Sequence, residues 1–107
     1  MRTPHLLQLA MIRAIGEALT ASGYLSVGEQ AAVLGLSRST AWNIVRAKHK
    51  TSGLSSSVIK RMLAQPQLPA QVRIAIHEYI DQKSAGRFGH NSTQLRRFAA
   101  GTRSVQL

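Results

Sequence analysis

Apolar side chains recur at every fourth position near the start of the chain, at Leu7, Met11, Ile15 and Leu19. This spacing puts the apolar side chains on one face of a helix. Pro4 suits the first turn of a helix, and Gly23 suits the position just after a helix end. We therefore predict an amphipathic helix from Pro4 to about Ser22.

Two shorter helical segments follow, and a single glycine separates them. Ser26 and Glu29 have the spacing of a capping box, in which each side chain binds the free backbone N–H of the other, so a helix begins at Ser26. Gly35 ends that helix. Ser37 is the N-cap candidate of the next helix, which we expect over residues 38–48. Its outer face carries Arg38, Ser39, Trp42, Asn43 and Arg46.

The remainder of the chain repeats this alternation of short apolar periods and turn residues. We predict a helix capped near Ser55 or Ser56 and running to about Ala64. A second begins with Pro69 at its first position and ends at Gly86, and a third covers residues 93–100 behind a Ser92 cap. No run of period-two alternation indicates a strand. The predicted fold is all-α, with five to six helices.

The net charge of the chain says more about its partner than its length does. The chain has 107 residues, with 14 Lys+Arg against 4 Asp+Glu, which gives a formal net charge of +10. No acid lies between Glu29 and Glu78, and none follows Asp81. Because such charge repels itself in a folded chain, a polyanionic partner is the simplest reason to keep it.

Other features narrow the class of protein. The absence of cysteine excludes disulfides, zinc fingers and thiol catalysis. The start of the chain does not read as a signal peptide, and no apolar run reaches the roughly 20 residues of a membrane span. We expect a cytoplasmic, nucleoid-associated protein that does not bind membranes. With so few carboxylates and no paired nucleophile and base, we predict no enzyme, no catalytic residues, no metal and no cofactor; His77 and Asp81, four residues apart, are read as an ordinary helix contact.

Residues 27–46 meet the steric needs of a helix-turn-helix. Its first helix needs a small residue at the crossing, its turn a residue that tolerates positive φ, and its second helix apolar residues facing inward. The chain supplies these as Ala31, Gly35, Leu36, Ala41 and Ile44.

The segment LGLSRSTAWNIV resembles the turn and recognition helix of lambda-repressor-like helix-turn-helix regulators, of the phage-repressor and lac-repressor types. The close match covers about twenty residues, and a looser helical likeness extends to about Ser84. Ala41 departs from the Val or Ile that is common in the family. The resemblance implies a lambda-repressor-like bundle with a central helix-turn-helix over residues 1–86, and it has no counterpart for the basic segment 87–107.

In such regulators the second helix enters the major groove of DNA and reads base edges from its N-terminal part. The matching positions are Arg38, Ser39 and Asn43, where Arg pairs with guanine and Asn with adenine. Trp42 either contacts a thymine methyl group or supports the plane of the Arg38 guanidinium, or it packs on the neighbouring loop. Candidate phosphate contacts are Ser26, Ser37, Thr40, Arg46, Lys48, Lys50 and Thr51.

The resemblance also implies a homodimer on a palindromic site. Segment 87–107 is then a dimer clasp built on Phe88, Leu95 and Phe98, or a DNA arm built on Arg96, Arg97 and Arg103. Without a second domain, no small-molecule effector is evident. We expect a sequence-specific transcriptional regulator or repressor that binds double-stranded DNA. The alternatives are an antitoxin-type adaptor that binds a protein partner, and a basic RNA-binding protein, although exposed aromatic side chains for base stacking are few.

Overall fold

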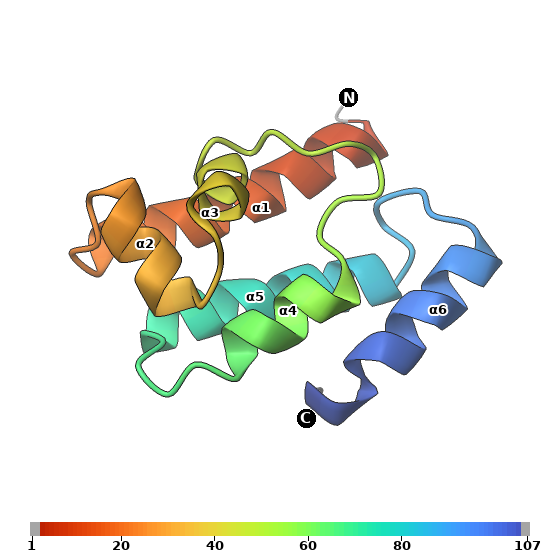
Figure 1. Cartoon of the computed structure of the whole chain (residues 1–107). Coiled ribbons are helices and arrows are strands. Elements are labelled where there is room, and N and C mark those ends of the chain that lie inside the picture. The colour runs from red at the N-terminus through yellow and green to blue at the C-terminus, as the bar shows by residue number, and fades with distance from the viewer. Residues whose placement is uncertain (1–2, 106–107) are drawn as a thin grey trace.

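The computed structural model describes residues 3–105, and this part of the chain is helical and contains no strand, as the sequence predicts (Figure 1). The α-helices are α1 (Pro4–Ala21), α2 (Val27–Leu34), α3 (Arg38–Val45), α4 (Ser56–Leu63), α5 (Ala70–Ser84) and α6 (Ser92–Thr102). A short 3₁₀ turn, Arg103–Val105, follows α6. No helix within these residues is both long and apolar enough to traverse a bilayer.

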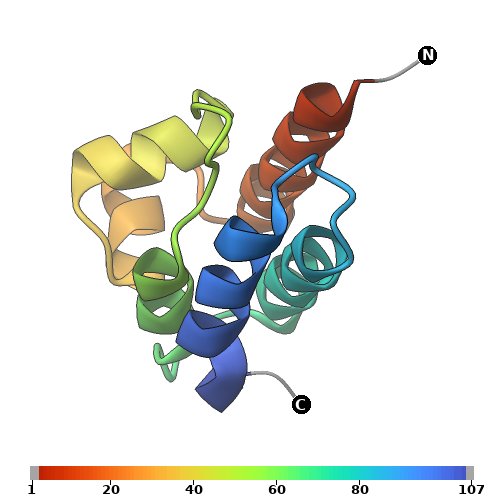
Figure 2. The same ribbon diagram turned by 90° about the vertical axis from the view of Figure 1, so that its right-hand side faces the viewer.

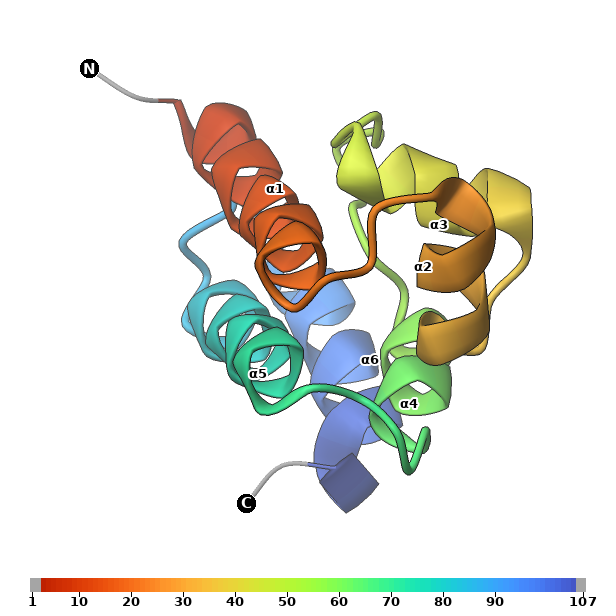
Figure 3. The same cartoon turned by 90° about the vertical axis from the view of Figure 1, so that its left-hand side faces the viewer.

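The two longest helices, α1 and α5, lie side by side along one side of the bundle (Figure 3). Their facing side chains are buried, among them Ile12, Ile15, Ile76 and Ile80. Helices α2 and α3 pack on each other, and α3 also packs on α1. The core therefore extends from the α1–α5 pair to the inner face of α3.

Helix α6 lies across α4 and α5 (Figure 2). Its Phe98 is buried, and so is Phe88 from the preceding turn, whose ring centroid lies 5.2 Å from that of Tyr79. These two phenylalanines belong to the core of their own chain, so neither offers its ring to the dimer clasp that the sequence analysis gave as one of two alternatives for segment 87–107. Leu95 is only partly buried.

Local capping signals placed most helix ends correctly. Ser26 forms the predicted capping box with Glu29, and Ser37 and Ser55 cap α3 and α4 with their hydroxyl groups. At α6 the cap is Asn91 instead of Ser92, because the Asn91 carboxamide accepts from the Gln94 N–H and the Gln94 side chain accepts from the Asn91 N–H. Stronger reciprocal capping thus starts this helix one residue earlier than predicted.

Two other boundaries differ from the prediction. Pro69 occupies the N-cap of α5 instead of its first helical position, since its backbone is extended, with ψ at 147°. Helix α6 continues to Thr102, beyond the predicted end at Ala100. The continuation follows from tertiary packing, because Thr102 in this last turn is completely buried.

A buried polar network fixes the loop that joins α3 to α4. The Tyr79 hydroxyl of α5 donates to Gln8 Oε1 of α1 at 2.8 Å and accepts from the Leu54 N–H at 2.9 Å. Gln8 Nε2 donates to the carbonyl oxygen of Thr51 at 2.8 Å. Backbone groups of an irregular loop need such partners when they are buried, and here α1 and α5 supply them together.

Gly53 lies where this network comes closest to the backbone. Its φ is +68°, a left-handed conformation that strains other residues. A Cβ atom at this position would overlap Gln8 Oε1 and the Tyr79 hydroxyl. Only glycine therefore allows the loop to pass this close to the two side chains.

Lys83, in the last turn of α5, is the charged member of the network. Its ammonium group donates to the carbonyl oxygens of Ser52 at 2.8 Å and Leu54 at 3.0 Å, and it lies 4.4 Å from the ring centroid of Phe98. The residue is only 5% exposed. Burial removes water from the charge and lowers the pKa of Lys83 from 10.5 to about 8.

We predict that Gly53→Ala lowers the free energy of unfolding by about 2–4 kcal/mol, because the new methyl group disrupts buried hydrogen bonds as well as straining the backbone. Gly23→Ala is the matched control, since Gly23 also has a positive φ, at +97°, but no atom lies within 4 Å of its Cβ position. Its expected cost is about 1 kcal/mol. Denaturant titration measures both, and equal losses would contradict the proposed crowding at Gly53.

We also predict that stability rises with pH as Lys83 loses its proton in the folded state. Between its folded pKa of about 8 and its ordinary value of 10.5, the unfolded chain binds more protons, so the free energy of unfolding increases with pH. Below this range the penalty of burying the charge is fully present. Lys83→Met should remove this rise, and urea titrations of both proteins from about pH 7.5 to 9.5 measure it. Parallel pH profiles would refute the assignment.

Candidate nucleic-acid interface

The connection between α2 and α3 is a tight left-handed turn. Gly35 has φ 70° and ψ 30°, as predicted for the residue that ends α2. The Leu36 N–H donates to the carbonyl of Ala31 at 3.0 Å, which closes the end of that helix. The Gln65 side chain fills the space beside the Gly35 Cα. Ser37 then caps α3, so the direction changes within three residues.

The inner face of α3 is fixed against two other helices. Ala41 and Ile44 are completely buried, Ala31 of α2 is nearly so, and the partly buried Leu36 packs against the core. On the α1 side, a Cβ atom at Gly16 would lie 2.9 Å from the Val45 Cα. Glycine thus permits close contact between α1 and the last turn of α3.

The outer face of α3 is exposed, as the sequence predicts. The exposed side chains are Arg38, Ser39, Trp42, Asn43 and Arg46. At the N-terminal end, a Cβ atom at Gly28 would lie 3.0 Å from Arg38 Nη2, so the guanidinium group rests over the first turn of α2. The face offers amide, hydroxyl and guanidinium groups from neighbouring turns of one short helix.

Helix α3 is shorter than predicted, because it ends at Val45 and does not reach Lys48. Ala47 adopts a left-handed conformation with φ 53°, and the Lys48 N–H donates to the Asn43 carbonyl at 2.8 Å. This is a glycine-type helix end. Sequence reasoning missed it because alanine, a strong helix former, occupies the position where glycine is usual.

The early end of α3 brings two cations to Trp42. The Arg46 guanidinium lies 5.5 Å and the Lys48 ammonium 4.9 Å from the centre of the indole ring. Trp42 also lines a hollow of about 360 Å³ with Leu25 and Val27, from the segment that enters and begins α2. Trp42 therefore borders the segment that enters α2, and its cationic neighbours are Arg46 and Lys48.

Hydroxyl groups gather at the N-terminus of α3. The Ser37 hydroxyl donates to Thr40 Oγ1 at 2.9 Å and lies 3.3 Å from Ser39 Oγ, and no acid occupies the first turn. Ser26 differs, because its hydroxyl donates to Glu29 Oε1 at 3.0 Å. An anion at the N-terminus of α3 would be attracted by the helix dipole. At Ser26 the same anion would be repelled by the Glu29 carboxylate.

The loop after α3 presents Lys50 and Thr51 on the surface, and both side chains are exposed. Its backbone is nevertheless fixed, because the Thr51 carbonyl lies within hydrogen-bond distance of both Gln8 Nε2 and His90 Nε2, at 2.8 Å and 2.9 Å. His49 is half-buried, and desolvation lowers its pKa, which favours the neutral ring. The residues that position this loop, Gln8, Tyr79, Lys83 and His90, were not identified from the sequence; the one signal was a glutamine inside the apolar stripe of α1.

The interface contains no acidic residue. The four acids of the chain, Glu17, Glu29, Glu78 and Asp81, are all exposed, and none of them lies on α3 or on the loop to α4. Among residues 3–105 no group of three His, Cys, Asp or Glu side chains is arranged to hold a metal ion. The outer face of α3 and its loop are thus polar and basic, and they carry no acid of their own.

Comparison of the chain with family models, curated proteins and solved structures finds no significant match.

Proposed function

We propose that this protein binds double-stranded DNA by inserting α3 into the major groove. The observation that carries the proposal is the division of α3 into a clamped inner face and an exposed polar, basic outer face. Eight residues of α-helix are about 12 Å long, close to the width of the major groove of about 12 Å. A short helix held on two sides meets the groove as a rigid element.

Arg38, Ser39 and Asn43 are the proposed base readers. Arg38 and Asn43 can each make paired hydrogen bonds, to guanine and adenine respectively, and each such pair discriminates by about 1–3 kcal/mol. The Arg38 guanidinium must swing away from the first turn of α2 to reach a base. Trp42 supplies an apolar contact for a thymine methyl group from the middle of the face.

Affinity comes from the ends of the same helix. Ser37 and Thr40 place hydroxyl groups at its N-terminus, where backbone N–H groups and the helix dipole favour a phosphate. Arg46, Lys48, Lys50 and Thr51 supply hydroxyl and cationic groups at the other end, which bind any sequence alike. Ser26 contributes less, because its hydroxyl is paired with Glu29.

The order of helices and the α2–α3 turn support a lambda-repressor-like arrangement, and the proposal includes a regulator that binds an inverted repeat as two copies. RNA is the less favoured partner, because the rings of Tyr79, Phe88 and Phe98 are buried and cannot stack on bases. An adaptor role has in its favour the exposed Leu25 and Trp42 beside one hollow. DNA binding is favoured over the adaptor role, because it also explains the positive charge around this hollow.

The decisive experiment is selection of bound sequences from a random duplex pool, followed by competition of the selected duplex against scrambled duplex and single-stranded RNA at two salt concentrations. Sequence-dependent binding supports the proposal, and salt dependence by itself reports only phosphate contact. Equal competition by all three nucleic acids would refute it. The stoichiometry on an inverted repeat then decides whether two copies bind.

We predict that Arg38→Ala and Asn43→Ala each lower the preference for the selected duplex by about tenfold, since each removes one base-specific pair. Lys50→Ala should weaken selected and scrambled duplexes alike, because its charge contacts only the backbone. Arg87→Ala, an exposed charge beyond α5, is the matched control and should leave the preference unchanged. Equal losses on both duplexes from Arg38→Ala and Asn43→Ala would contradict the reading role.

We further predict that duplex DNA changes the fluorescence of Trp42, which is the one tryptophan of the chain and is 39% exposed. Docking of α3 removes water from the indole and disturbs its contacts with Arg46 and Lys48. Titration with the selected duplex should give a saturable change in intensity and emission maximum. An unchanged spectrum at saturation, with binding verified by anisotropy of labelled DNA, would place α3 outside the interface.

A further inference from the structure

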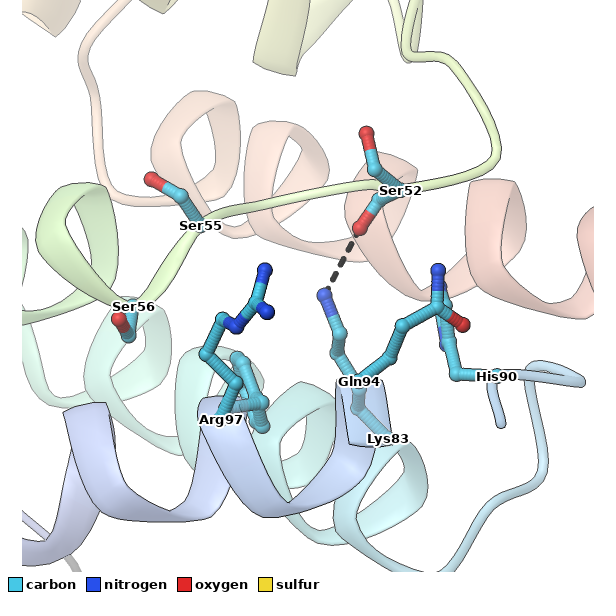
Figure 4. Close-up of a pocket in the computed structure, with 8 residues that line it drawn as sticks. Ser52, Ser55, Ser56, Lys83, His90, Gln94 and Arg97 are labelled. Atoms are coloured by element: carbon cyan, nitrogen blue, oxygen red, sulfur yellow. Dashed lines mark hydrogen bonds between the residues drawn. The ribbon is translucent and has the colours of Figure 1, made fainter. Parts of the chain in front are cut away.

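A second basic site lies away from the outer face of α3, in a hollow of about 270 Å³ between the start of α4 and the inner side of α6 (Figure 4). Its lining residues come from four parts of the chain and are Ser52, Ser55, Ser56, Lys83, His90, Gln94, Arg97 and Phe98. Figure 4 shows Lys83 and Arg97 directed from their helices toward the loop that carries Ser52 and Ser55. Two cationic side chains therefore point toward the same backbone segment at this hollow.

Hydrogen-bond donors face this hollow from several directions. Lys83 Nζ has three N–H groups, and carbonyls of the loop take two of them. Arg97 makes no hydrogen bond or ion pair with another described residue, although its guanidinium carries five donors. Ser56 opens α4, and the first N–H groups of a helix have no acceptor inside that helix.

No negative charge balances these groups, because none of the lining residues is Asp or Glu. Lys83 is a buried cation whose neighbours are uncharged carbonyl groups and aromatic rings, an arrangement that costs free energy. The hollow is also firmly built, since Gly101 lets α6 approach so closely that a Cβ atom there would overlap the Ser56 hydroxyl. An anion in the hollow would relieve the uncompensated charge without rearranging the walls.

We propose that this hollow binds a phosphate group, held by Lys83, Arg97 and the N-terminus of α4. A phosphate has enough acceptor oxygens to use donors from three elements at once, and arginine matches its geometry with paired hydrogen bonds. Two sources share this chemistry: a free phosphorylated small molecule, and a phosphate of a nucleic-acid backbone. Burial already lowers the pKa of Lys83, and a bound anion would raise it again.

The test is a titration of the full chain with inorganic phosphate at constant ionic strength, followed by amide chemical shifts. Shifts should saturate at Ser56 and Ser57 and at the residues around Lys83 and Arg97. Arg97→Ala should weaken binding by about tenfold or more, since it removes a charge-assisted contact. Arg96→Ala is the matched control, because this neighbouring exposed arginine does not line the hollow. Lys83→Gln is a second variant, and it should also weaken phosphate binding.

Saturable shifts that Arg97→Ala weakens and Arg96→Ala does not weaken support the proposal. Absence of saturation, or equal weakening by Arg96→Ala and Arg97→Ala, would overturn it, because binding would then reflect general charge. A second arm separates the two sources. If Arg97→Ala also lowers affinity for scrambled duplex more than Arg96→Ala does, the phosphate belongs to a backbone; if duplex affinity is unchanged, it belongs to a free ligand. The first arm contains no DNA, so its failure is distinct from failure of the proposed function.

Discussion

The hydroxyl of Tyr79 is the contact on which the arrangement of helices depends. It joins α1, through Gln8, to the backbone of Leu54 in the loop that leads out of α3. That loop has no regular structure of its own, so its buried polar groups must be paired by side chains from elsewhere. Burial raises the pKa of Tyr79, and the hydroxyl therefore stays protonated and available as a donor.

The loop held by this contact positions the helices on both sides of it along the chain. Upstream, the fixed loop and the close approach of Gly16 to Val45 hold α3 against α1, so its outer face keeps one orientation. Downstream, the loop delivers Ser55 and α4 to the place where α6 packs. The DNA reading proposed for α3 would need such preorganisation, because a loosely held helix would lose entropy on binding.

Charge is distributed in two tiers around this framework. The first tier is the solvated face of α3 and its loop, where cations cost little and attract a polyanion over a distance set by salt. The second tier is the hollow between α4 and α6, where Lys83 is desolvated and Arg97 stands without an acidic partner. The proposed ligands differ accordingly: the grooved surface of a duplex for the first tier, and one phosphate group for the second.

The sequence by itself determined the local features: the capping box at Ser26 and Glu29, the glycine turn at Gly35, and the separation of apolar from polar sides in α3. Each depends on residues a few positions apart, whose backbone geometry is a local property. Only the tertiary structure decided that Phe88 and Phe98 lie in the core, that Ala47 ends α3, and that Tyr79 meets Gln8, 71 residues away. Such pairings arise from packing between distant segments, which no period along the chain encodes.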